Sequence, residues 1–290
     1  MSTPRPLQKE QAMIQNPVRS SVLQSTLLHV FLTILALLFL APLYLMLVYA
    51  THPDNGIYSG ALWFGSEAVN NFKNLQADTN FLRAMGNSII IAVLYTAVSL
   101  MLTSMAGFAF TKYEFWGKNF WFGVILATLA IPVFVTIIPQ YILMARNFHL
   151  TNTYWAVILP TLANTMGIFY MRQAFLTVHT DLLNAARIDG ASEWRVFWQI
   201  ALPVVRPAMA ALAILLFLSS WNDYLWPLLV LNNKDAYTIP VALGTLVGLT
   251  RVSWGGIMMG TALSTVPFLI LFVIAQRQII SGVAGGSVKG

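Results

Sequence analysis

A polar segment at residues 181–203, which reads DLLNAARIDGASEWRVFWQIALP, lies between two hydrophobic stretches of the chain. Four residues of its first half recur at the i, i+3, i+4, i+7 spacing of one helical face: Leu182, Ala185, Ala186 and Asp189. The spacing predicts a short helix with a face of small residues, whose backbone another protein can approach closely. We therefore interpret this segment as a docking element for a partner.

The same segment carries the signals of a turn and of a second helix. Asp189-Gly190 is a turn dipeptide, and Gly190 is free to adopt the left-handed conformation that commonly ends a helix. Ser192 is suited to cap a second helix that runs through Ile200. We expect a helix–turn–helix that lies outside the membrane.

Composition excludes a water-soluble globular protein. Of the 290 residues, 58% are hydrophobic and only 9% are charged, and the mean hydropathy is +0.70, whereas soluble domains carry about 25% charged residues. The net charge of +6 comes from basic residues scattered in the loops between apolar runs, which is typical of membrane topology rather than of a nucleic-acid-binding patch. The chain is predicted to be a membrane protein that does not bind nucleic acid.

Six hydrophobic segments are long enough to cross a bilayer, which takes about 20 residues each. They lie at residues 27–50, 87–110, 120–144, 154–175, 204–231 and 256–279. Prolines interrupt several of them, and we expect kinks there because proline frees a carbonyl group from its helical hydrogen bond. The fold class predicted is all-α: a polytopic membrane domain at residues 27–280, between a polar N-terminal segment (1–26) and a glycine-rich tail (281–290). We expect this tail, left alone, to be disordered rather than helical, because it has four glycines and no large side chain.

The distribution of basic residues orients these segments. With the N-terminus in the cytoplasm, 11 of the 16 lysine and arginine residues fall in cytoplasmic segments. They are Arg5, Lys9, Arg19, Lys112, Lys118, Arg172, Arg187, Arg195, Arg206, Arg277 and Lys289. The excess places both termini and the docking segment in the cytoplasm.

Catalytic and cofactor chemistry is missing from the sequence. There is no cysteine, the four histidines lie in different segments without a second ligand at metal spacing, and no phosphate-binding loop precedes a helix. We predict that the chain is not an enzyme and holds no cofactor or metal. If it takes part in ATP-driven transport, a separate ATPase subunit must hydrolyse the ATP.

One acidic residue falls within a predicted membrane segment. Asp223 lies in the run Trp221-Asn222-Asp223-Tyr224, near the outer end of the fifth segment. An ionisable group in a membrane segment suggests function, so these four residues are candidates for the substrate pathway. A structural role, with Asp223 solvated or paired with Arg251, stays equally open.

Tryptophans mark the expected outer boundary of the membrane. Trp63, Trp155, Trp226 and Trp254 lie at or near it, as aromatic residues that anchor membrane proteins do. We expect anchoring for each of them, with stacking on a sugar as the alternative.

The docking segment resembles a known family motif. Ala185-Ala186, Gly190, Ile200 and Leu202-Pro203 are spaced as in the "EAA" loop of membrane subunits of ATP-binding-cassette (ABC) importers. In that family the loop forms a coupling helix that sits in a cleft of the ATPase subunit. The resemblance assigns ATPase coupling to the following residues of the loop at 176–203: Asn184, Ala185, Ala186, Asp189, Gly190, Ala191, Ile200, Leu202 and Pro203. Asn184 departs from the motif, which has glutamate there.

Further residues resemble the maltose-type carbohydrate branch of these permeases. They are the run from Thr180 to Leu231, the C-terminal GVAGGSVKG, and Pro132, Pro139-Gln140-Tyr141 and Leu159-Pro160 in the middle segments. The resemblance implies a type I importer fold in a bacterial or archaeal plasma (inner) membrane. It also implies a heterodimer with a paralogous permease, two ATPase subunits, an extracytoplasmic solute-binding protein, a sugar substrate and membrane lipids around the helices. The alternatives are a permease for a non-sugar solute, a membrane scaffold, or an ion-coupled carrier without an ATPase.

Overall fold

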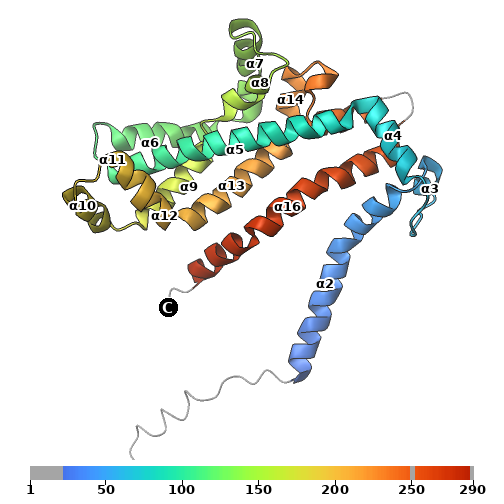
Figure 1. The fold of residues 1–290 in the computed structure, drawn as a ribbon, viewed down its shortest axis with the longest axis horizontal. Coiled ribbons are helices and arrows are strands. Elements are labelled where there is room, and N and C mark those ends of the chain that lie inside the picture. The colour runs from blue at the N-terminus through green and yellow to red at the C-terminus, as the bar shows by residue number, and fades with distance from the viewer. Residues whose placement is uncertain (1–21, 249–251, 288–290) are drawn as a thin grey trace, which may run out of the picture.

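The computed structural model describes residues 22–248 and 252–287, and all of the regular structure in this part of the chain is helical (Figure 1). This confirms the predicted all-α class. Three helices are long and apolar enough to cross a membrane by themselves. They are α2 (Val22–Tyr49), α5 (Phe81–Lys112) and α16 (Trp254–Ser287).

Helix α5 is the centre of the bundle, and it packs against α9 (Thr165–Leu176) and α13 (Arg206–Trp221) (Figure 1). Small residues allow the close approach. A Cβ atom on Gly107 of α5 would lie 2.8 Å from the backbone nitrogen of Arg172 on α9. Small side chains bring helices together where the lipid provides no hydrophobic force between them.

The third predicted span is broken at a proline. It forms α6 (Lys118–Ala127), the short η1 (Thr128–Ala130), α7 (Val133–Ile142) and η2 (Leu143–Asn147), with a bend of 100° between its two halves. The break comes at Ile131 and Pro132, because a residue before proline is pushed out of the helical conformation. The predicted kink is therefore confirmed here.

The fourth and fifth predicted spans are also discontinuous. The fourth is divided into α8 (Tyr154–Ile158), η3 (Leu159–Thr161) and α9, and the fifth into α13 and α14 (Leu225–Val230). Three described helices are continuous spans, and the number rises to at most five when each sharply bent pair counts as one. The described residues therefore do not form six uninterrupted spans.

The two ends of the bundle carry different short elements (Figure 1). One end, which we call the docking end, is formed by the segment after α9. It contains α10 (Thr180–Ile188), α11 (Glu193–Arg195), the π-helix η4 (Val196–Ala201) and α12 (Leu202–Val204). The opposite end contains α3 (Asp54–Tyr58), α4 (Ala68–Thr79), η5 (Lys234–Ala236) and α15 (Ile239–Val247).

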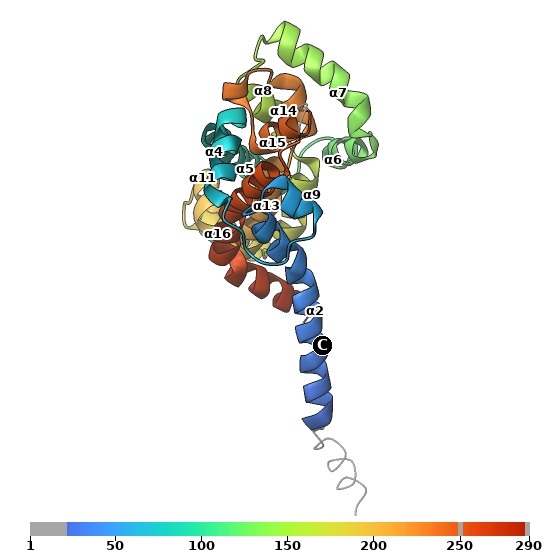
Figure 2. The same ribbon diagram turned by 90° about the vertical axis from the view of Figure 1, so that its right-hand side faces the viewer.

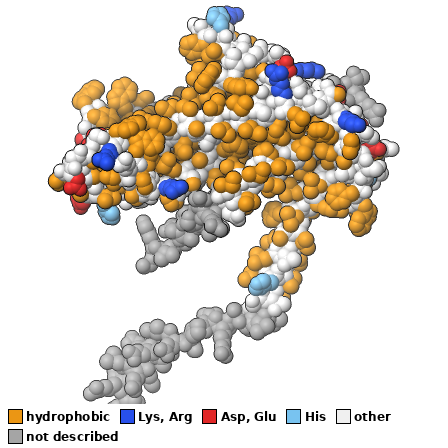
Figure 3. Space-filling model, in the orientation of Figure 1, with side chains coloured by type: hydrophobic (Ala, Val, Ile, Leu, Met, Phe, Trp, Pro, Cys, Tyr) orange, Lys and Arg blue, Asp and Glu red, His pale blue; other side chains and the backbone are white. Residues whose placement is uncertain are grey.

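Much of the apolar surface has no cover from the chain itself. Helix α2 leans away from the bundle, α7 projects from its other side, and hydrophobic side chains cover most of the visible face (Figures 2 and 3). In the described part of α2, no residue of the most hydrophobic stretch of 18 residues is buried. On α7, Phe134 is 76% exposed. Such surfaces need lipid or another protein chain around them.

Two expectations from the sequence are wrong. Helix α16 continues to Ser287, so most of the glycine-rich tail is helical; extending an existing helix avoids the costly nucleation step. Residues 288–290 lie outside the described residues. Trp226 is buried rather than anchored at a membrane boundary, and its Nε1–H donates a hydrogen bond to the Ala156 carbonyl at 3.0 Å.

Candidate functional site

The first helix of the docking segment ends as predicted. Helix α10 stops at Ile188, and Gly190 follows with a left-handed φ of +82°. The Ala191 N–H donates to the Ala186 carbonyl at 3.0 Å, which satisfies a group that the end of the helix leaves free. The turn reverses the chain within a few residues.

The second helix begins at the predicted cap. The Ser192 hydroxyl accepts a hydrogen bond from the Arg195 N–H at 3.4 Å. Helical structure then continues through Ile200, although the middle of the segment is a π-helix rather than an α-helix. The chain bends by 83° after Val204, where α13 begins.

One face of the docking segment packs onto the bundle. Leu183, Val196 and Phe197 are buried, and they belong to one apolar cluster with aromatic residues of α5 and α9. The Phe197 ring centroid lies 5.2 Å from that of Phe108, which in turn lies 5.3 Å from that of Phe175. Each buried side chain of this size stabilises the fold by roughly 1.5–3 kcal/mol. The segment is therefore anchored to the bundle by its own apolar core.

The exposed face differs from the face that the sequence predicted. Ala185 and Asp189 are exposed, but Ala186 is half-buried and packs against the core. Leu182 and Ile188, which are 47% and 86% exposed, complete the outer face of α10. Ile188 was not among the predicted site residues, although its i+3 spacing from Ala185 was a usable signal.

The other residues assigned to ATPase coupling divide between the two faces. Asn184, Gly190 and Pro203 are exposed, whereas Ala191, Ile200 and Leu202 pack against the core. The inward residues shape the segment, and the outward residues are free to contact a partner.

A polar cluster fastens the two short helices to each other and to α5. Arg187 of α10 binds Glu193 of α11 through two hydrogen bonds, of 2.7 and 3.0 Å, and also donates to the Asn184 side chain at 3.0 Å. The hydroxyl of Tyr113, the first residue after α5, donates to the Glu193 Oε2 oxygen at 2.6 Å. We call these residues the Tyr113–Glu193–Arg187 cluster.

The charges of the cluster reinforce each other. Hydrogen bonds from Arg187 and then from Tyr113 lower the pKa of Glu193 to about 2. Burial and the bond to Glu193 raise the pKa of Tyr113 to about 12, so its hydroxyl keeps the proton that it donates. The same carboxylate raises the pKa of Arg187. The cluster therefore keeps one charge state at physiological pH.

The pathway candidates lie at the break between α13 and α14. Trp221 is buried and stacks on Phe217 with 5.5 Å between ring centroids. Asn222 and Tyr224 are exposed, and Asp223 is half-buried. The Asp223 carboxylate accepts the Trp226 N–H at 3.4 Å, in the manner of a helix cap. Arg251, its suggested partner, lies outside the described residues.

Asp223 also borders a small polar cavity of about 40 Å³. Helices α5, α8 and α13 contribute the other lining residues, among them Tyr95, Val157 and Ser220. The space is large enough for one water molecule and much too small for a sugar. In this conformation Asp223 is thus a wall residue of the bundle rather than part of an open channel.

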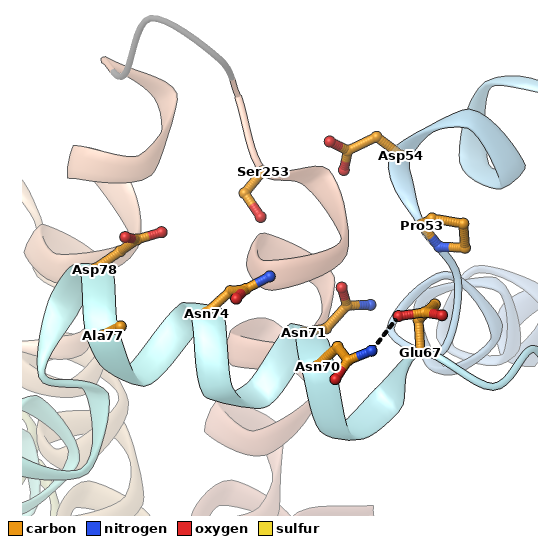
Figure 4. A pocket seen from close by; sticks show the side chains of 9 residues that line it. All are labelled: Pro53, Asp54, Glu67, Asn70, Asn71, Asn74, Ala77, Asp78 and Ser253. Atoms are coloured by element: carbon orange, nitrogen blue, oxygen red, sulfur yellow. Dashed lines mark hydrogen bonds between the residues drawn. The ribbon is translucent and has the colours of Figure 1, made fainter.

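A larger polar pocket of about 380 Å³ opens at the opposite end of the bundle. Asp54, Asn74 and Ser253 face one space between α3, α4 and the start of α16 (Figure 4). Glu67 on its rim accepts a hydrogen bond of 2.6 Å from Asn70. Among the described residues, no group of His, Cys, Asp or Glu side chains is arranged to hold a metal ion.

Comparison with protein families gives one match that covers most of the chain. The family described as "Binding-protein-dependent transport system inner membrane component" matches residues 99–284, which include the whole docking segment and Asp223.

Individual proteins and one solved structure are also similar. The arabinooligosaccharide permease protein AraQ of Halalkalibacterium halodurans is 41% identical over 71% of this chain and 73% of its own length. The lactose permease protein LacG of Rhizobium radiobacter is 36% identical over 89% and 94%. The sn-glycerol-3-phosphate permease protein UgpE of Escherichia coli is 31% identical over 93% and 98%. A chain of a bacterial ABC transporter that imports alginate has the same fold, with a TM-score of 0.75, 21% identity, and coverage of 90% of this chain and 98% of that one.

Proposed function

The chain belongs to the family of binding-protein-dependent transport system inner membrane components, and we propose from this premise that it forms half of the translocation pathway of an ATP-driven sugar importer. It is a permease subunit and not itself an enzyme. Two of its relatives are named for arabinooligosaccharides and lactose, which supports a sugar as the substrate. A polyol phosphate is the second candidate, because another relative is named for sn-glycerol-3-phosphate.

The observation that carries the proposal is the outer face of α10. Leu182, Ala185 and Ile188 form a small apolar surface on an element that is otherwise polar and that projects from the end of the bundle. Ile188, at 86% exposure, is the most exposed side chain of this surface and is suited to insert into a cleft of a partner. We propose that the partner is an ABC ATPase, with Asn184, Asp189 and Gly190 beside the contact.

The proposed membrane arrangement has six crossings. Helices α2, α5 and α16 each cross alone, and the pairs α6/α7, α8/α9 and α13/α14 cross as broken spans. Both termini and the docking end face the cytoplasm, in agreement with the excess of basic residues on that side. Broken helices are tolerated at membrane depth where they face protein or a water-filled path.

The proposed assembly contains a paralogous permease, two ATPase subunits and an extracytoplasmic binding protein in the inner membrane of a prokaryote. The exposed apolar surfaces of α2 and α7 would then be covered by the second permease and by lipid. Asp223, with Asn222 and Tyr224, is proposed to meet the substrate when the break between α13 and α14 opens. The chain needs no cofactor of its own.

Purification of the tagged chain from its own membrane tests the proposal. An ABC ATPase should co-purify, and the reconstituted complex should take up a labelled oligosaccharide only with ATP and a binding protein. Uptake without any ATPase would support an ion-coupled carrier, and absence of both uptake and ATPase would support a scaffold.

A further inference from the structure

Tyr113 connects the central helix to the docking segment without belonging to either. It follows α5 directly with an extended backbone (φ −107°, ψ 149°). Its ring packs edge-on against Phe108 of α5 at 5.5 Å between centroids, which fixes its direction. Its hydroxyl donates a hydrogen bond of 2.6 Å to the carboxylate of Glu193, which lies 80 residues later in the sequence.

Glu193 in turn links Tyr113 to α10 through Arg187. Arg187 binds the same carboxylate through two parallel bonds, a geometry that resists rotation of one helix against the other. The exposure of α10 makes this connection important, since Leu183 is the only residue of α10 that is fully buried in the bundle. Without the cluster, only the apolar contacts of Leu183 and the half-buried Ala186 would hold α10 to the bundle, so α10 could rock.

The far end of α5 is fastened in a similar way. The Asn87 side chain donates to the carbonyl groups of Asp235 and Tyr237 at 2.9 Å each, and the Ser88 hydroxyl accepts the Ile239 N–H at 2.8 Å. Helix α5 has 32 residues, or about 48 Å at 1.5 Å per residue. It is therefore one continuous helix whose two ends are both hydrogen-bonded through side chains to segments far away in the sequence.

We propose that Tyr113 is a positioning residue for energy coupling, which ties α10 to α5 through Glu193 and Arg187 so that a displacement of α10 moves the whole bundle. The inference rests on the proposed function, because it takes the ATPase as the source of that displacement. Tyr113 does not touch substrate or nucleotide. It acts by holding the helix that the ATPase moves.

The test is the Tyr113→Phe variant in the purified complex with its ATPase, reconstituted in lipid vesicles. The substitution removes one hydroxyl and keeps the ring against Phe108. The measured quantity is sugar transported per ATP hydrolysed, which we expect to fall about fivefold, the size of effect that the loss of one hydrogen bond produces. ATPase co-purification and membrane abundance should stay at the wild-type level, because the core contacts of the docking segment are untouched.

The matched control is Glu114→Gln, one residue further along the chain. It removes the ion pair of 2.8 Å between the exposed Glu114 and Lys118, the first residue of α6, a pair that joins no residue of the docking segment. Its ratio of sugar to ATP should equal that of the wild type. A similar fall in both variants would mean that the loop is merely sensitive to substitution, and it would overturn the assignment to Tyr113.

A second pair of variants separates positioning from a general structural role. In a Glu193→Ala background the partner of the hydroxyl is gone, so adding Tyr113→Phe should change the ratio no further. Independent, multiplied effects would overturn the inference, as would a normal ratio in Tyr113→Phe alone. If the wild-type chain binds no ATPase at all, the proposed function fails first and the inference falls with it.

Discussion

The docking segment and the break around Asp223 are both interruptions of long helices, but they are held in different ways. The docking segment packs on α5 and α9, but its own shape is set by contacts close in sequence: a turn at Gly190, a cap at Ser192, and an ion pair six residues apart between Arg187 and Glu193. The break holds Asp223 against residues of α5 and α8 that lie far away in the chain. The first is a preformed surface, whereas the second depends on how the surrounding helices are arranged.

This difference indicates where movement occurs. A docking surface must keep its shape while it transmits force, so locally satisfied contacts suit it. A pathway must open and close, and the bond from the Trp226 N–H to the Asp223 carboxylate, at 3.4 Å, is long enough to be given up when the break rearranges. The following variants test whether the two regions differ as described.

The largest effect is expected from Gly190→Val. A β-branched residue at φ +82° is strained by about 1–3 kcal/mol, although the space around the site is open. Uptake should fall about tenfold or more while the protein remains inserted. Gly190→Asn, which tolerates the left-handed conformation, should retain most uptake.

Gly60 offers a matched control at the opposite end. It has φ +72° and equally open surroundings. Gly60→Val should carry the same strain without uncoupling ATP hydrolysis from uptake. If both valine variants are equally harmful, the coupling role of the docking turn is contradicted.

A several-fold loss of uptake is expected for Asp223→Ala, with membrane abundance unchanged. Asp223→Asn keeps the oxygen that accepts the Trp226 N–H but removes the charge, so it separates capping from substrate contact. Uptake by vesicles, divided by the amount of protein, is the measurement. Full activity of Asp223→Asn, or abundance that falls in step with activity, would assign Asp223 a structural role.

A smaller effect is expected for Ser192→Ala. Loss of the cap should destabilise the start of the second docking helix by about 0.5–1 kcal/mol, seen as faster hydrogen exchange at the Arg195 amide. Thr153→Ala removes an equivalent cap, of 3.3 Å, from α8 at the other end. Both should loosen their own helix, but only Ser192→Ala should lower the sugar-to-ATP ratio.

The stability that the Tyr113–Glu193–Arg187 cluster gives to the docking segment is not expected to change with pH across the neutral range. The pKa of Glu193 is lowered to about 2, so its contribution is complete above its unfolded value near 4.5 and is lost only as the pH falls from there toward 2. The raised pKa of Tyr113, about 12, preserves its proton donor until the pH passes 10. Exchange protection at Ala191 should stay constant from about pH 5 to about pH 9, and a midpoint inside that range would contradict the account.

The docking segment could be predicted from the sequence because its determinants are local. Gly190 and Ser192 act within a few residues, and the structure confirms the turn and the cap that they were expected to form. The inward orientation of Ala186 could not be foreseen, because it depends on the aromatic core contributed by α5 and α9. Nor could the position of Tyr113, whose partner is 80 residues away.

The membrane spans show the same limit. Hydropathy finds α2, α5 and α16, since a long apolar run is a local property. It does not show that the third to fifth segments are broken, because the breaks depend on capping by Asn164 and on distant contacts of Asp223 as well as on prolines. Burial of Trp226 likewise follows from packing against Ala156 rather than from any pattern around it.

The most direct test of the central claim is a cross-link from the outer face of α10. The chain has no cysteine, so Ile188→Cys creates a single reactive site at a position that is 86% exposed. Trp63→Cys, at a position 81% exposed at the opposite end, is the control. In the purified complex, the Ile188→Cys variant should cross-link to the ATPase subunit and the Trp63→Cys variant should not. An Ile188→Cys thiol that reacts freely with small reagents but never cross-links to the ATPase would contradict the account.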